Sequence, residues 1–174
     1  DTSEMEPEPC AAMIRRYPDC VVGAKSAHFQ GPGWEAAGGA IEAARLSETI
    51  AMIDFAPRPT RSYEELLARM SPGDIHTHLY SRHIPLLDEG EKVNDYMWKV
   101  RERGLIFDTG HGSGSFWFRT AEPAMQQGFP PDTISTDMHT LSCEGPAYDM
   151  PTVMTRLVHL GMPLQAVIRS STLA

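Results

Sequence analysis

Residues 49–80 read TIAMIDFAPRPTRSYEELLARMSPGDIHTHLY, and this stretch decides the fold. An apolar, β-branched run, TIAMIDF, is followed by a helical segment over Ser62–Met70 and then by a second run, DIHTHLY, from Asp74. Ser62 with Glu65 three residues later is the capping-box pattern that marks the start of a helix. Strand, helix and strand in this order predict a βαβ unit with parallel strands.

The same alternation extends over the rest of the chain. Further strand runs are CVVGAK ending at Lys25, GLIFDTGHG from Gly104, and DTISTDMH from Asp132. Further helices are predicted near Trp34–Arg45, Val93–Arg103, Glu122–Gln127 and Thr152–Leu160, with Gly104 and Gly128 at the positions of C-terminal caps. Five strands that alternate with helices indicate an α/β protein with a parallel sheet.

Polar side chains close these strand runs at regular intervals. They are Lys25, Asp54, His78, His111 and Asp137, spaced 24 to 33 residues apart. A TIM barrel of about 250 residues in eight units repeats about every 31 residues, so each interval fits one βα unit. The 174 residues are too few for a complete barrel and predict a partial one. Because barrel strands end at one face, the five side chains are expected to converge on a metal or acid/base site.

Two of these candidates also have a structural interpretation. Lys25 could extend to the surface with its stem buried, and Asp54 could be a hydrogen-bonded acid within an apolar run. His76 and His78 lie two apart, so on a regular strand they face one side and resemble a zinc-binding pair. Asp137 and His139 have the same spacing, which lets the acid orient the imidazole or hold a metal.

Composition excludes several classes of partner. A formal charge of -8 with no basic stripe argues against nucleic acid as a partner, and no apolar run approaches the roughly 20 residues that span a membrane.

Three widely spaced cysteines predict neither a disulfide framework nor a zinc ribbon. The acidic start lacks the pattern of a signal peptide, which favours a soluble, cytoplasmic protein over an exported one.

Five stretches in this order carry a family resemblance: VVGAKSAHFQGPGW, MIDFAPRPTRSYEELLARMSPGDIHTHLY, RERGLIFDTGHGSGSF, QGFPPDTISTDMH and PTVMTRLVHLGMPLQAVIRSSTLA. They resemble the amidohydrolase superfamily, in particular its deacetylase and dihydroorotase-like metallohydrolases. The resemblance implies that residues 1–174 are the C-terminal portion of a (β/α)8 barrel, strands four to eight with their helices. It also implies that strands one to three and a flanking small β domain are absent from this chain.

The resemblance further implies a site that binds one or two divalent ions, typically zinc. Lys25 matches the family's carboxylated lysine, His78 its strand-six histidine and Asp137 its strand-eight aspartate, while Asp54 stands where most members have a histidine. A lysine carbamate is anionic and can bridge two cations. Asp137 is then both a metal ligand and the catalytic proton carrier. His28, His111 and His139 are assigned to the substrate carbonyl or to the layer behind the ligands.

The implied reaction is hydrolysis of an amide-type C–N bond in a small molecule by a metal-activated water. An N-acyl amino acid is the first substrate class, and a cyclic amide is the second. A non-catalytic barrel remnant, with Asp54 marking a lost site, is the alternative outside the enzymes. Association into a homo-oligomer stays open. Residues 1–174 alone are expected to be inactive, because the family's strand-one His-x-His is missing from them.

Overall fold

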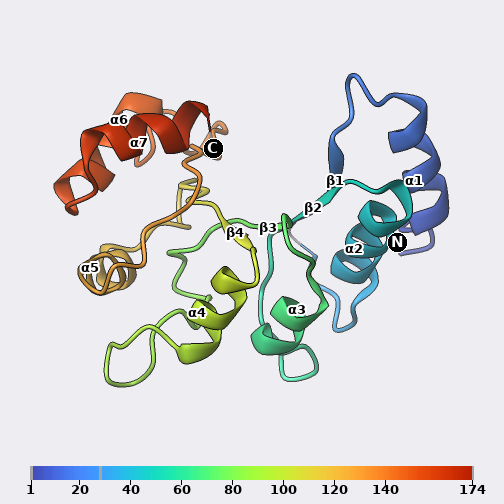
Figure 1. Ribbon diagram of the computed structural model, residues 1–174, viewed down its shortest axis with the longest axis horizontal. Helices are drawn as coiled ribbons and strands as arrows, with labels where there is room; N and C mark the ends of the chain where they lie inside the picture. The colour runs from blue at the N-terminus through green and yellow to red at the C-terminus, as the bar shows by residue number, and fades with distance from the viewer. Residues whose placement is uncertain (1, 28, 174) are drawn as a thin grey trace. The chain divides into compact units, whose positions relative to one another are not determined.

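Helices and strands alternate as far as residue 126, and two further helices follow (Figure 1). The computed structural model describes residues 2–27 and 29–173. The strands are β1 (Gly23–Ser26), β2 (Ile50–Ile53), β3 (Ile75–His76) and β4 (Ile106–Phe107). The helices are α1 (Pro7–Arg16), α2 (Glu35–Ser47), α3 (Tyr63–Arg69), α4 (Asp95–Glu102), α5 (Phe118–Gln126), α6 (Met150–His159) and α7 (Leu164–Thr172). The α/β class predicted from the sequence is confirmed.

The sheet is parallel, and its strand order β1-β2-β3-β4 follows the sequence. Gly23 of β1 is opposite Ile50 of β2, and Met52 of β2 is opposite Ile75 of β3. Parallel neighbours need a crossover connection, which α2 and α3 provide for the first two pairs. The predicted βαβ unit over residues 49–80 is therefore present.

Two compact units make up the chain. Unit 1 is Asp1–His76 with Arg103–Leu105, and unit 2 is Thr77–Glu102 with Ile106–Ala174. Among the described residues, no helix of either unit is both long enough and apolar enough to cross a membrane.

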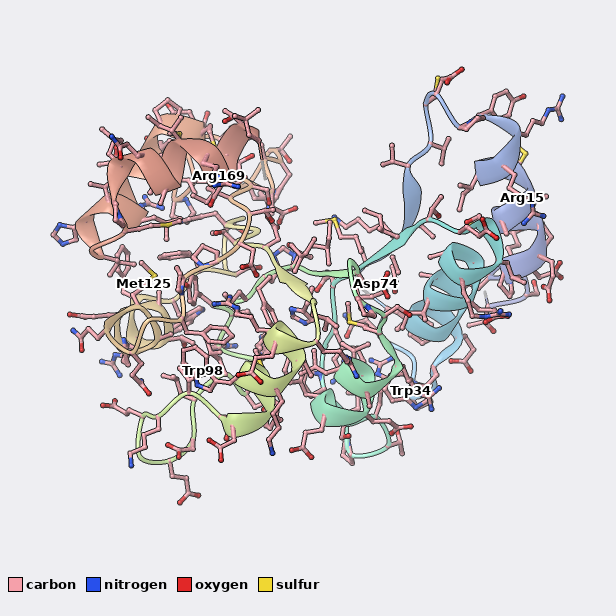
Figure 2. All side chains as sticks on the ribbon, in the orientation of Figure 1. Arg15, Trp34, Asp74, Trp98, Met125 and Arg169 are labelled. Carbon is pink, nitrogen blue, oxygen red and sulfur yellow. The ribbon has the colours of Figure 1, made fainter. Side chains whose placement is uncertain are left out.

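The core of unit 1 lies where α2 packs against α1, β1 and β2. Ile14 of α1, Ala24 of β1 and Ala43 of α2 form its buried cluster. Small side chains on the strand and the helix let their backbones approach closely. Asp74, labelled in Figure 2, fixes the start of β3, because its Oδ1 accepts from the Ala51 amide at 2.8 Å and its Oδ2 from Ser71 at 2.7 Å.

β1 is an edge strand of the described sheet. Val22, directly before it, has 74% of its surface exposed. A pocket of about 420 Å³ lies beside β1, lined by residues of α1, β1 and α2.

Arg61 ties together the two loops that follow β1 and β2. Its guanidinium donates to the carbonyls of Gly33 (2.8 Å) and Ala56 (3.1 Å) and lies over the Phe55 ring, 5.0 Å from the centroid. Only 2% of Arg61 is exposed, and burial lowers its pKa. Both loops leave the carboxyl ends of strands, so Arg61 fixes the shape of the edge at which barrel sites form.

Unit 2 has an aromatic core around β4. Trp98 of α4, labelled in Figure 2, meets the ring of Phe129 edge-on with centroids 4.8 Å apart. The Arg101 guanidinium lies 3.7 Å from the Phe129 centroid, and Tyr80 donates to the Phe129 carbonyl at 3.1 Å. Burial raises the pKa of Tyr80, so the phenol stays a protonated donor.

The helix caps agree with the sequence analysis. Ser62 Oγ accepts from the Glu65 amide at 3.1 Å, as a capping box requires. Gly104 and Gly128 follow α4 and α5 with φ of 102° and 80°, the left-handed conformation of a C-terminal cap. The predicted helices are all present, with ends shifted by a few residues.

Two helices and the extent of the strands were predicted wrongly. α1 was missed because acidic residues and prolines suggest irregular structure, although Pro7 at the first helical position lacks only an amide hydrogen that has no helical partner there. α7 was also missed. The strands are shorter than the apolar runs, and of the described part of the last run, 132–139, only Thr133 pairs as a parallel bridge, with Asp108.

Candidate functional site

The predicted metal ligands are divided between the two units. Lys25 and Asp54 belong to unit 1, and His78 and Asp137 belong to unit 2. The structure places each pair within its own unit, and the convergence of all four stays a prediction. His28 lies outside the described residues.

In unit 1, Lys25 and Asp54 lie at the carboxyl ends of neighbouring strands. Lys25 is opposite Met52, and the pairing continues beyond β2 because the Asp54 amide donates to the Ser26 carbonyl at 3.0 Å. Asp54 is two residues after Met52, so the side chains of Lys25 and Asp54 are on one face of the sheet. The opposite face packs on α2. In a barrel the helices lie outside, so this pair is on the interior face.

In unit 2, His78 is buried, with 6% of its surface exposed, and lies two residues after the end of β3. β3 ends at His76 and His78 has a left-handed φ of 63°, so the prediction that the two histidines share a face by strand alternation is wrong. The His78 Nδ1 is 2.6 Å from the Gly110 carbonyl oxygen. A carbonyl can only accept, so Nδ1 carries the hydrogen. The tautomer is then the one whose Nε2 holds the lone pair that a metal needs.

Asp108, at the end of β4, joins three segments of unit 2. Its carboxylate accepts hydrogen bonds from Thr77 Oγ1 (2.7 Å), Thr133 Oγ1 (2.8 Å) and Ser135 Oγ (2.7 Å). Only 2% of Asp108 is exposed, so these hydroxyls replace the water that a carboxylate otherwise requires. The sequence analysis did not select Asp108, although an acid within the apolar run LIFDT was a signal.

Asp137 is half-buried beside the loop that follows β4. A Cβ placed on Gly112 would be 2.6 Å from Asp137 Oδ2, so the carboxylate packs directly against this glycine. The Gly112 amide donates to the Thr136 carbonyl at 2.9 Å and holds the two segments together. Asp137 has φ of 46°, a conformation that Asp tolerates better than most residues. The absence of a side chain at Gly112 thus makes room for the predicted catalytic carboxylate.

His111 is held by contacts on both sides of its ring. Its Nδ1 donates to the Gly112 carbonyl at 3.0 Å, and its Nε2 accepts from Arg156 Nη1 of α6. The ring stacks on Phe116, with centroids 4.7 Å apart and planes at 9°. The Nε2 lone pair is thus engaged by Arg156, and a role of His111 at the substrate carbonyl or behind the ligands stays a prediction. Arg156 itself was not predicted.

His139 lies in a turn on the surface. Its Nδ1 accepts from the Leu141 amide at 3.2 Å, and its own amide donates to Ser142 Oγ at 3.0 Å. The left-handed φ of Asp137 breaks the strand alternation that was expected to align the two residues. The structure therefore does not place His139 with Asp137 by the predicted route.

Burial lowers the pKa of His111, partly opposed by its bond to the Gly112 carbonyl, and the charge of Arg156 lowers it further. In the unfolded chain the imidazole binds a proton near pH 6.5 and in the folded chain only at lower pH. Stability from His111 is therefore complete above about pH 6.5 and is lost as the pH falls through the folded pKa.

We expect the urea concentration at the unfolding midpoint to be lower at pH 5.5 than at pH 7.5. In His111→Gln this decrease should be smaller. Urea unfolding at the two pH values measures it. His159→Gln, an exposed histidine of α6, is the control and should keep the wild-type dependence. An unchanged dependence in His111→Gln would contradict the assignment.

The donor chemistry fits a divalent metal. His78 is oriented through Nδ1 by a backbone carbonyl, which is the usual support for a metal-binding histidine. Asp137 of the same unit adds carboxylate oxygens. No group of three or more His, Cys, Asp or Glu side chains that could hold an ion occurs among the described residues.

Comparison with known proteins supplies the wider context. No protein-family profile matches the chain. A deacetylase from Enterococcus faecalis is 37% identical over 114 residues, which are 64% of this chain and 31% of that protein. The match thus spans about a third of the length of this relative.

Two solved structures resemble nearly the whole chain. An adenine deaminase superposes with a TM-score of 0.88 at 30% identity, over 99% of this chain and 49% of that one. A dihydroorotase superposes with a TM-score of 0.81 at 27% identity, over 99% of this chain and 46% of that one. The parallel βα units agree with these similarities, and so does the position of His78 and Asp137 against the loop that follows β4. The chain belongs to the amidohydrolase superfamily and forms part of its α/β barrel.

Proposed function

We propose that the complete protein is a metal-dependent hydrolase that cleaves the amide C–N bond of an N-acyl amino acid. The observation that carries the proposal is that His78 and Asp137 both contact the loop that follows β4 in unit 2. Gly110 of that loop fixes the tautomer of His78, and Gly112 makes room for Asp137. The similarity to a deacetylase supports the reaction class.

The proposed ligands are Lys25 as its carbamate, Asp54, His78 and Asp137. A bound divalent ion, zinc in one or two copies, would supply a water of lowered pKa and polarise the substrate carbonyl. Asp54 in place of a neutral histidine adds negative charge to this set. That charge favours harder ions than a histidine would.

Asp137 is proposed to move the proton. As the water oxygen bonds to the carbonyl carbon, the Asp137 carboxylate accepts the water proton and then delivers it to the amide nitrogen as the C–N bond breaks. The products are a carboxylic acid and a free amine. Packing on Gly112 holds the carboxylate in one orientation during both transfers.

A cyclic amide is the second candidate substrate, and the similarity to a dihydroorotase favours it. The same bond is broken, but acid and amine remain in one molecule. Asp54 is the feature that supports the non-catalytic alternative, because it departs from the family's histidine.

The test is metal analysis of the complete protein, with turnover assays on N-acetyl amino acids and on cyclic amides such as dihydroorotate. We expect bound metal and turnover of N-acetyl amino acids, and we expect Lys25→Met to lose both. Turnover of cyclic amides alone would favour the second candidate. A wild-type protein with neither metal nor turnover would overturn the proposal.

A further inference from the structure

Arg156 carries a positive charge that the described residues do not neutralise. Its Nη1 donates to Nε2 of His111, and no carboxylate of the described residues is within salt-bridge distance of its guanidinium. Arg156 is partly exposed, so its remaining N–H groups are accessible. A guanidinium held by a neutral ring keeps its full charge for another partner.

His111 is suited to orient this guanidinium. Its Nδ1–H is committed to the Gly112 carbonyl, which leaves Nε2 as an acceptor. Stacking on Phe116 fixes the plane of the ring, and only 2% of His111 is exposed. Because His111 already holds the Arg156 guanidinium, the side chain loses little further conformational entropy when a ligand binds to it.

The pair lies next to the proposed proton carrier. The His111 amide donates to the Ser135 carbonyl at 3.2 Å, and the next residue, Gly112, packs against the Asp137 carboxylate. Two consecutive residues of one loop therefore contact both groups: His111 accepts from Arg156, and Gly112 packs against Asp137. In an N-acyl amino acid the carboxylate is only two bonds from the amide nitrogen, so its anchor must be close to the proton donor.

We propose that Arg156 binds the carboxylate of the substrate and that His111 positions it, which makes anionic N-acyl amino acids the preferred substrates. The inference rests on the proposed function for its substrate class. The fork of N–H groups on guanidinium matches the two oxygens of a carboxylate, and such bonds are stronger than those to neutral groups.

Calorimetric titration of the complete protein, with Asp137→Asn present in every variant so that the ligands are not hydrolysed, tests the inference without relying on turnover. The ligands are an N-acetyl amino acid and its neutral primary amide. We expect Arg156→Ala to weaken binding of the carboxylate about 10- to 100-fold more than binding of the amide. Arg156→Lys, which keeps the charge but not the fork, should lose an intermediate amount.

Arg169→Ala is the matched control, because Arg169 is an exposed arginine of α7 in the same unit (Figure 2). It should keep the wild-type preference for the carboxylate. Circular dichroism verifies the folding of each variant, and Arg156→Lys gives the answer if the alanine variant does not fold. Equal losses for both ligands, or a wild type that does not prefer the carboxylate, would overturn the inference.

The two proposals fail in different ways. A wild type that binds the carboxylate through Arg156 but hydrolyses no amide would remove the proposed function and keep the anchor. A wild type that hydrolyses both ligands with equal affinity would keep the hydrolase and remove the anchor.

Discussion

Asp137→Asn is expected to slow amide hydrolysis by the complete protein about 10²- to 10⁴-fold, the range for loss of a general acid/base. The amide of Asn has the size of the carboxylate, so its packing against Gly112 should persist. It can neither accept the water proton nor return it to the leaving nitrogen. Steady-state kinetics should show the loss mainly in kcat.

Glu122→Gln provides the control for charge, because Glu122 is an exposed acid of α5 in the same unit. Its kcat should be that of the wild type. Metal content separates the two roles proposed for Asp137: a slow variant that keeps its metal has lost the proton carrier, and one without metal has lost a ligand. Turnover near the wild-type rate in Asp137→Asn would show that another group moves the proton.

The order of the elements could be predicted because it depends on local pattern. TIAMIDF and DIHTHLY are β-branched runs between turn residues, and β2 and β3 lie inside them. The capping box at Ser62 is likewise a local signal. Pattern cannot tell where a strand ends, because His78 and Asp137 take left-handed conformations that no neighbouring residue demands.

The candidate site was predictable only in part, for the same reason. The regular intervals between polar residues selected His78 and Asp137, which lie shortly after β3 and after the bridge of Thr133 to Asp108. The support around them depends on segments far apart in the sequence. Asp108 binds hydroxyls of Thr77 and Ser135, which are 31 and 27 residues away, and Arg156 is 45 residues from His111. Arg156, on a helix, shows no sequence signal that distinguishes it from a solvated cation.

Gly110 is the residue on which these contacts of unit 2 depend most. Its φ is 48°, and a Cβ there would contact Thr77 Oγ1, His78 Nδ1 (2.5 Å) and the His78 backbone nitrogen (2.9 Å). Neither partner can yield cheaply, because Thr77 donates to the buried Asp108 and His78 donates to Gly110 itself. Any side chain at position 110 must therefore displace the histidine or break the Asp108 network.

We expect Gly110→Ala to lower the free energy of unfolding by about 2–4 kcal/mol, the sum of a strained φ and a steric clash. Urea unfolding measures this loss. Gly128→Ala separates the two causes, because Gly128 has φ of 80° but no atom within 4 Å of the position that the added methyl group would occupy. It should cost only about 1 kcal/mol. Gly110→Ala should also lose bound metal, because the orientation of His78 depends on the carbonyl of this residue. Equal losses in the two variants, with metal retained, would mean that the loop adjusts freely and that Gly110 does not hold His78 in place.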